Sequence, residues 1–252
     1  IASFYLGAQD QKRANDTVSL GLFLSMIHGI LLTVGCIGVL RPFLHLFTTN
    51  PEVIQNGITY GTLAFLFNFL NSIAIAYEKI YQAEGKMTVS MIAMLCGCIC
   101  NIILDPMMIF GIGFFPEMGI AGAALATGIG QVLTLVIYLI IYYTKESQLR
   151  IHFSKEMFQK TICKRIYSVG LPATMNLSLP SIMITLLNGI LAEFSDMYVL
   201  VLGIYYKLQT FIYLTVNGIV QGIRPLIGYN YGAKEHERVK KIFFTSLLLA
   251  VS

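Results

Sequence analysis

Long apolar runs separated by short polar stretches dominate this chain. Six of the runs are twenty or more residues long, and they cover about residues 17–40, 54–80, 88–112, 120–143, 166–191 and 197–227. About 20 helical residues cross the hydrocarbon core of a bilayer, which is roughly 30 Å thick. The pattern therefore predicts six complete membrane-spanning helices and the start of a seventh after Lys241.

The composition indicates the same class of protein. Of the 252 residues, 56% are hydrophobic and only 12% are charged, and the mean hydropathy is +0.72. A soluble globular domain has about twice that share of charged residues. We predict an all-α fold, a multi-pass transmembrane helical bundle that has the lipid bilayer as its surroundings. The net charge of +4 does not indicate nucleic-acid binding, because the basic residues are scattered among short loops.

The cysteines give no sign of a metal site. All five lie in or beside apolar runs, and none of their spacings is the C-x2-C that is typical of zinc ligands. We interpret them as small apolar packing residues, and we predict no metal and no cofactor.

Two loops resemble each other. Residues 6–13 read LGAQDQKR and residues 231–238 read YGAKEHER, an offset of 225 residues. Six spans lie between them, an even number, so both loops are expected on the same side of the membrane, as a parallel duplication of six-helix halves requires. We predict that residues 1–143 belong to an N-terminal lobe, 144–165 to a cytoplasmic linker and 166–252 to a C-terminal lobe. Because the chain starts at Ile1 without a methionine and stops inside an apolar run, we expect it to be a piece of a longer protein.

Charge asymmetry predicts the orientation of the spans. Fourteen Lys and Arg residues fall in loops on the side of the repeated loops and the linker, whereas the opposite loops hold only Arg41. By the positive-inside rule, the repeated loops and the linker are expected to be cytoplasmic.

One carboxylate lies inside an apolar span. Asp105 is followed by Pro106, and Asn101 lies one helical turn earlier on the same face. An ionisable residue at this depth costs roughly 3 kcal/mol or more and usually marks a transport or proton path. Pro106 also cannot donate a hydrogen bond to the carbonyl of Ile102. We predict a functional site here, and the alternative is a structural carboxyl that braces the proline kink.

Further polar residues lie at membrane depth. They are either lining residues of a substrate cavity or groups that bond between helices. The candidates for a substrate cavity are Lys207, Asn68, Asn71, Gln131, Asn176 and Gln209.

Several segments resemble the multidrug and toxic compound extrusion (MATE) family, most of all its bacterial drug exporters. They are QAEGK at 82–86, NIILDP at 101–106, GIAGAALAT at 119–127, GLP at 170–172 and RPLIGYNYGA at 224–233. The resemblance implies a twelve-helix fold of two pseudo-repeated six-helix lobes around a central cavity. It implies that this chain holds helices three to eight and the ends of helices two and nine.

The resemblance also implies a cation site. In the family an N-lobe site is built from an aspartate on the first helix, an Asn and an Asp on the fifth and a Thr on the sixth. The matching residues here are Asn101, Asp105 and Thr127, and the first-helix aspartate lies outside this chain. Some members carry a glutamate on the seventh helix, but no acidic residue lies between Gly170 and Leu191.

The function that follows from the resemblance is secondary active efflux rather than enzymatic catalysis. The expected reaction is antiport of amphipathic or cationic organic compounds against Na⁺ or H⁺ in the cell membrane. The residues do not choose between the two ions or give an oligomeric state. A lipid-linked oligosaccharide flippase is an alternative, although it should need several basic cavity residues, and only Lys207 is present. An intramembrane aspartyl hydrolase would need two neighbouring carboxylates, and this chain supplies one.

Overall fold

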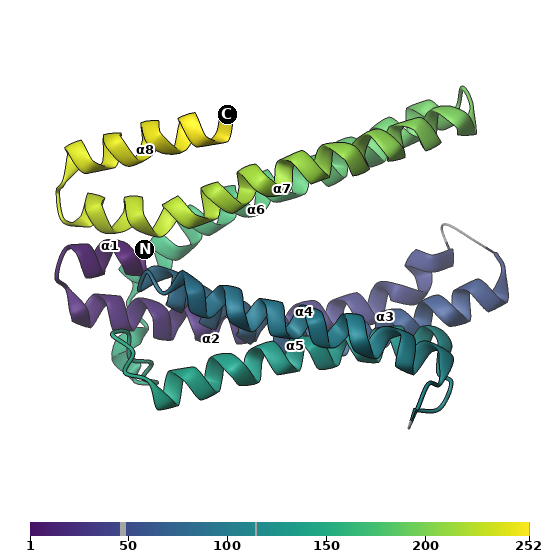
Figure 1. Ribbon diagram of the computed structural model, residues 1–252, viewed down its shortest axis with the longest axis horizontal. Helices are drawn as coiled ribbons and strands as arrows, with labels where there is room; N and C mark the ends of the chain where they lie inside the picture. The colour runs from purple at the N-terminus through teal and green to yellow at the C-terminus, as the bar shows by residue number, and fades with distance from the viewer. Residues whose placement is uncertain (46–48, 114, 252) are drawn as a thin grey trace. The chain divides into compact units, whose positions relative to one another are not determined.

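The computed structural model describes residues 1–45, 49–113 and 115–251, and every regular element in this part of the chain is helical (Figure 1). The α-helices are α1 (Ala2–Gly7), α2 (Gln11–His45), α3 (Pro51–Ala83), α4 (Met87–Phe110), α5 (Gly119–Thr144), α6 (Lys160–Ala192), α7 (Asp196–Gly232) and α8 (His236–Val251). A short 3₁₀ helix, η1 (Lys155–Met157), lies between α5 and α6. The predicted all-α fold is confirmed.

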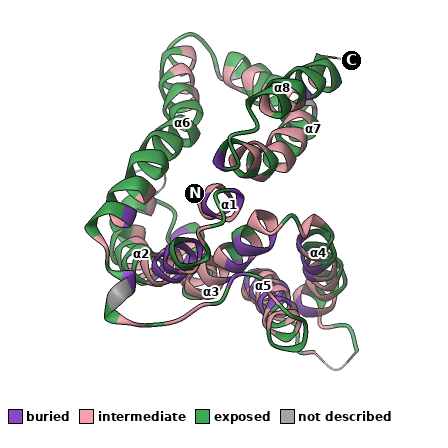
Figure 2. Cartoon of the chain, turned by 90° about the vertical axis from the view of Figure 1, so that its left-hand side faces the viewer, coloured by how far each residue is buried: buried purple, intermediate pink, exposed green. Residues whose placement is uncertain are grey.

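Helices α2 to α7 are all long and apolar enough to cross a bilayer, which confirms the six predicted spans. Their apolar side chains are widely exposed, as the green colouring along α6 shows in Figure 2. Leu177 on α6 is 79% exposed and Phe211 on α7 is 81% exposed. Such apolar surfaces are typical of helices that contact lipid tails or other membrane helices. In lipid, the backbone N–H and C=O groups must form hydrogen bonds within the helix, whereas apolar side chains need no partner.

Five of the six spanning helices extend beyond both ends of the predicted apolar runs, whereas α4 ends at Phe110, before the predicted residue 112. The first apolar run was predicted to end near Leu40, but α2 continues to His45 with Pro42 inside it. The expected end was wrong. Proline removes one hydrogen bond of a helix, and in membrane helices neighbouring groups often satisfy the freed carbonyl, so the helix continues. α6 likewise runs unbroken through Pro172 and Pro180.

The described chain divides into two compact units: one is residues 18–152, and the other is residues 1–17 with residues 153–252. In the first unit α5 packs against both α3 and α4. The buried Tyr81 hydroxyl of α3 donates to the Tyr138 carbonyl of α5 at 2.9 Å, and the two rings stack 5.6 Å apart. The lobe boundaries near residues 144 and 165 stay a prediction.

The loop after α3 holds the beginning of the linker inside this first unit. The Glu84 carboxylate is fully buried and accepts hydrogen bonds from the Leu149 backbone N–H, at 2.8 Å, and from the Ser147 hydroxyl. The Lys86 ammonium lies 2.7 Å from the same carboxylate and donates to the Glu146 carbonyl at 3.0 Å. A buried carboxylate with two hydrogen-bond donors and one ion-pair partner fixes the linker against the end of α3.

The two repeated loops have the same backbone conformation. Gln9 and Lys234, which are 225 residues apart, have φ angles of 58° and 61°, and no other described non-glycine residue has a positive φ. The following helices begin two residues later, at Gln11 and His236. Equivalent hydrogen bonds of 2.9 Å join Asp10 N to Tyr5 O and Glu235 N to Asn230 O. The short sequence match therefore corresponds to a repeated structure.

We expect residues at opposite ends of α5 to be reached from opposite sides of the membrane. Glu117 and Lys145 are both exposed and lie just before and just after this 26-residue helix. A helix of that length spans about 39 Å. In intact cells an impermeant thiol reagent should label Glu117→Cys from outside and leave Lys145→Cys unlabelled until the membrane is opened. Labelling of both from outside would contradict the orientation inferred from the basic residues.

Candidate functional site

Helices α4 and α5 cross with their backbones in contact. A Cβ placed on Gly97 would lie 2.7 Å from the Gly130 carbonyl oxygen, and one placed on Gly130 would lie 2.7 Å from the Gly97 carbonyl oxygen. Only glycine fits at either position, and small residues permit this approach between membrane helices. Asn101 lies one turn after Gly97, and its Cβ is 3.2 Å from the position of a Gly130 Cβ. The crossing thus places Asn101 directly against α5.

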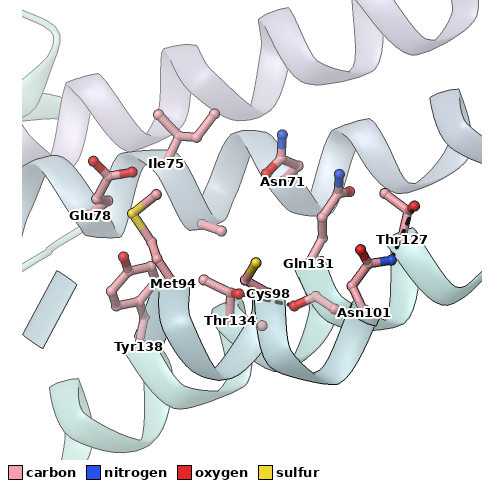
Figure 3. Close-up of a pocket in the computed structure, with 13 residues that line it drawn as sticks. Asn71, Ile75, Glu78, Met94, Cys98, Asn101, Thr127, Gln131, Thr134 and Tyr138 are labelled. Atoms are coloured by element: carbon pink, nitrogen blue, oxygen red, sulfur yellow. Dashed lines mark hydrogen bonds between the residues drawn. The ribbon is translucent and has the colours of Figure 1, made fainter. Parts of the chain in front are cut away.

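The three residues expected to form a cation site are brought together there. The Asn101 side-chain Nδ2 donates to Asp105 Oδ1 at 3.2 Å within α4, and it lies 3.4 Å from the Thr127 hydroxyl oxygen on α5. The contact with Thr127 is drawn as a dashed line in Figure 3. An amide, a carboxylate and a hydroxyl thus form one short polar chain between two membrane helices.

Thr127 has two roles at once. Its hydroxyl donates to the Ala123 carbonyl at 3.0 Å, one turn earlier in α5, as membrane threonines often do. Its oxygen still accepts from Asn101. The intrahelical bond therefore leaves lone-pair capacity for a ligand, since a hydroxyl has one donor and two acceptor sites.

Asp105 is half-buried, and no ion-pair partner for it lies in the described part of the chain. Among the described residues, no Lys, Arg or His forms an ion pair with its carboxylate. The next residue, Pro106, lies inside α4 and has no N–H, so the Ile102 carbonyl lacks its usual partner. Oxygen atoms and a negative charge therefore gather without a permanent cation.

A groove between α3, α4 and α5 opens beside this site. It encloses about 420 Å³, and Figure 3 shows Asn101 and Thr127 toward one end and Glu78 and Tyr138 toward the other. The polar side chains in its lining are Asn71, Glu78, Asn101, Thr127, Gln131, Thr134 and Tyr138. Gln131 Oε1 is buried and has no hydrogen-bond partner among the described residues. The groove therefore offers one buried hydrogen-bond acceptor that the described part of the protein leaves unused.

The expected cavity residues are divided between the two units. Asn71 and Gln131 line the groove, whereas Asn68 is not among its lining residues. The other three candidates, Asn176 on α6 and Lys207 and Gln209 on α7, belong to the second unit. Lys207 and Asn176 are exposed there. For the four candidates outside the groove, a role in a substrate cavity stays a prediction; they are Asn68, Asn176, Lys207 and Gln209.

Sequence reasoning missed Glu78. Its carboxylate accepts from Lys79 Nζ at 3.0 Å and from Gln82 Nε2 at 2.6 Å, and its side chain is only 16% exposed. The signal was available, because Asn71 and Glu78 are seven residues apart and therefore share one face of α3. It was overlooked because Glu78 lies near the end of an apolar run, where charged residues are ordinary.

Metal-binding clusters are absent from the described residues, where no group of three or more His, Cys, Asp or Glu is placed to hold an ion. The five cysteines are free thiols. That the protein works without a cofactor stays a prediction.

Six apolar spans with a polar site between the helices define a multi-pass helical membrane protein. The family can also be stated. The family model described as MatE matches residues 1–107 and 172–252, so this chain belongs to that family, and the expected MATE membership is confirmed.

Similar proteins agree with this assignment. The chain is 26% identical over 226 residues to the multidrug export protein MepA of Staphylococcus haemolyticus, covering 90% of this chain and 49% of MepA. A solved multidrug resistance MATE transporter in an outward-facing conformation has a TM-score of 0.89 at 23% identity, covering 98% of this chain and 55% of that one. The MATE multidrug transporter DinF-BH, solved in complex with a ligand, has a TM-score of 0.83 at 29% identity, covering 97% and 54%. The chain thus spans about half the length of these proteins.

Proposed function

We propose that this chain is part of a cation-coupled exporter of amphipathic organic compounds, which works by alternating access in the cell membrane. The observation that carries the proposal is the Asp105–Asn101–Thr127 network, in which a carboxylate at membrane depth has polar neighbours and no ion-pair partner among the described residues. The names of the similar proteins support it, since MepA is described as a multidrug export protein and DinF-BH as a multidrug transporter.

The charge of Asp105 explains how such a site would couple two fluxes. An unpaired carboxylate is costly away from water, so taking up a cation from outside stabilises the site. A cationic or polar substrate arriving from the cytoplasm would compete for the same negative charge. Cation and substrate would then occupy the protein alternately, which is the requirement for antiport.

The orientation of Asn101 distinguishes the two candidate ions. Its Nδ2 faces both Asp105 and Thr127, an arrangement that satisfies the carboxylate by hydrogen bonding. A proton could bind Asp105 without disturbing this amide. A sodium ion needs oxygen ligands, so the amide would have to turn and present Oδ1. Sodium binding therefore requires Asn101 to present its amide oxygen, whereas proton binding leaves the contacts of its Nδ2 in place.

The groove favours export of organic compounds over the flippase alternative. No Lys or Arg is among the residues that line it, so the described part of the groove holds no cation to meet a pyrophosphate. Transport also accounts for the site better than aspartyl hydrolysis. Asp105 accepts from Asn101, which Figure 3 shows toward one end of the groove, whereas Glu78 lies toward the other end. The hydrogen bonds of Glu78 go to Lys79 and Gln82 rather than to a second carboxyl group.

The direct test uses the full-length protein in lipid vesicles. Ethidium, a lipophilic cation, is placed on the cytoplasmic side, and a sodium or a pH gradient is imposed separately. Either gradient should drive ethidium transport above the level of protein-free vesicles. Transport that is identical with and without both gradients would refute cation coupling.

Ligand substitutions should separate the two ions. We expect Asn101→Ala and Thr127→Ala each to raise the sodium concentration for half-maximal transport about tenfold, the change that a loss of about 1.4 kcal/mol produces. Proton-driven transport should change less, because a proton needs only the Asp105 carboxylate.

Thr59→Ala is the matched control for Thr127→Ala. The Thr59 hydroxyl makes the same bond to the carbonyl one turn earlier, at 3.0 Å to Gln55, but Thr59 does not line the groove. It should leave the sodium dependence unchanged. Equal effects of the two threonine variants would show that Thr127 serves only its own helix.

A further inference from the structure

The strongest unexplained feature is the contact between α1 and the end of α7, which lie side by side in the second unit (Figure 1). A Cβ on Gly7 would overlap the Tyr229 carbonyl and lie 3.1 Å from Ala233 N. A Cβ on Gly232 would overlap the Phe4 carbonyl and lie 3.1 Å from the N of Ala8. The two backbones touch at both glycines, and neither position has room for a side chain.

The contact is symmetric with respect to the sequence repeat. Adding 225 converts Phe4 to Tyr229 and Gly7 to Gly232, so each copy's glycine meets the other copy's equivalent carbonyl. The offset also pairs Ser3 with Gly228, and these two residues lie against each other. Two unrelated segments have no reason to exchange contacts in this way, so the crossing is a local two-fold joint between the repeats.

The joint is held by backbone and ring contacts rather than by polar bonds between the two helices. No hydrogen bond or ion pair links α1 to α7 among the described residues of these two helices. Phe4 and Tyr231 contribute a tilted ring pair with centroids 6.1 Å apart. Individual dispersion contacts are weak, and smooth glycine surfaces separate without withdrawing interlocked side chains. A contact of this kind can part without leaving a hydrogen-bonding group or a charge without its partner.

We propose that this glycine joint is the contact that closes the cytoplasmic side between the two copies and must open in each transport cycle. The proposal rests on the proposed function, because only alternating access requires such a contact to break. The basic residues beside both repeated turns assign this end to the cytoplasm. Because each glycine meets the equivalent carbonyl of the other copy, Gly7 and Gly232 should contribute equally to this closure.

A disulfide across the joint is the decisive test. The Ser3 Cβ lies 3.6 Å from the position that a Cβ would take at Gly228, within the range of about 3.5–4.5 Å found in disulfides. Ser3→Cys and Gly228→Cys are combined in a cysteine-free version of the full-length protein in vesicles. Oxidation should crosslink the pair, lower ethidium transport at least tenfold, and leave transport recoverable by reduction. The single-cysteine variants should not respond to oxidant.

The outcomes separate the joint from the proposed function. Equal transport by the reduced and the fully crosslinked protein would overturn the joint as a moving contact, and failure to crosslink under any gradient would overturn the contact itself. The wild-type full-length protein checks the proposed function. If it moves no ethidium under either gradient, that function is refuted, independently of the crosslinking result.

Alanine substitutions test the symmetry without a transport assay. In the double-cysteine protein, Gly7→Ala and Gly232→Ala should each slow crosslinking by a similar factor, on the order of tenfold, because each adds a methyl group where a backbone carbonyl lies. Gly222→Ala on α7 is the control, since a Cβ there meets nothing within 4 Å. An effect at only one of the two joint glycines would contradict the exchange symmetry.

Discussion

Replacing Asp105 by Asn is expected to reduce gradient-driven ethidium transport to the level of protein-free vesicles. Asparagine keeps the shape of the side chain and an oxygen that can accept from Asn101 Nδ2, now 3.2 Å away. It cannot lose or regain a charge, so it can exchange neither a proton nor a sodium ion for substrate. The loss should appear with sodium and pH gradients alike, measured on the purified full-length protein in vesicles.

Two controls make the Asp105 result interpretable. Glu117→Gln removes an exposed loop carboxylate and should transport at the wild-type rate. The melting temperature of Asp105→Asn should stay close to that of the wild type, because its hydrogen bond to Asn101 is retained. Near wild-type exchange of ethidium for either cation by Asp105→Asn would leave Asp105 only its alternative role of bracing the helix at Pro106.

The fold was largely predictable from the sequence because the bilayer imposes a simple rule on it. Apolar runs of twenty residues located all six spans, and the four-residue spacing of Asn101 and Asp105 placed both on one face of α4. Thr127 came from the family resemblance, since nothing local shows which residue of α5 will meet Asn101. The contact between Thr127 and Asn101 depends on the close approach of Gly97 to Gly130. The sequence does not show which helix either glycine packs against.

Contacts between distant loops were not predictable. Glu84 accepts from Leu149, which is 65 residues away, and no periodic pattern connects a short loop to a linker. The continuation of α2 beyond Pro42 was missed for a different reason. The preference of proline for helix ends is a statistical tendency, and at membrane depth the loss of one hydrogen bond does not outweigh the rest of a long helix.

The repeat is visible partly in the sequence and partly in the structure. Eight aligned residues indicated a duplication, and the matching φ angles of Gln9 and Lys234 show that the duplicated turns fold alike. The exchanged contacts of Gly7 and Gly232 could not be read from either copy alone, because they exist only where the copies meet.

The second large effect is expected at the other glycine crossing, where Gly130→Ala should both destabilise the protein and disturb the cation site. The new methyl group would lie 2.7 Å from the Gly97 carbonyl oxygen, a backbone atom that cannot move aside, and 3.2 Å from Asn101 Cβ. Overpacking of this kind costs about 1–3 kcal/mol. In the purified full-length protein the melting temperature should fall, and the stabilisation expected from saturating sodium should be smaller than in the wild type.

Gly97→Ala tests the packing of α4 against α5 separately from the cation site. Its methyl group would meet the Gly130 carbonyl and the Thr134 hydroxyl rather than Asn101, so it should lower the melting temperature while affecting ion-dependent stabilisation less. Gly35→Ala, where a Cβ meets nothing within 4 Å, should be neutral or slightly stabilising, because alanine favours helix more than glycine does. If Gly130→Ala matched Gly35→Ala in both measurements, the close crossing of α4 and α5 would not be what holds Asn101 against Thr127.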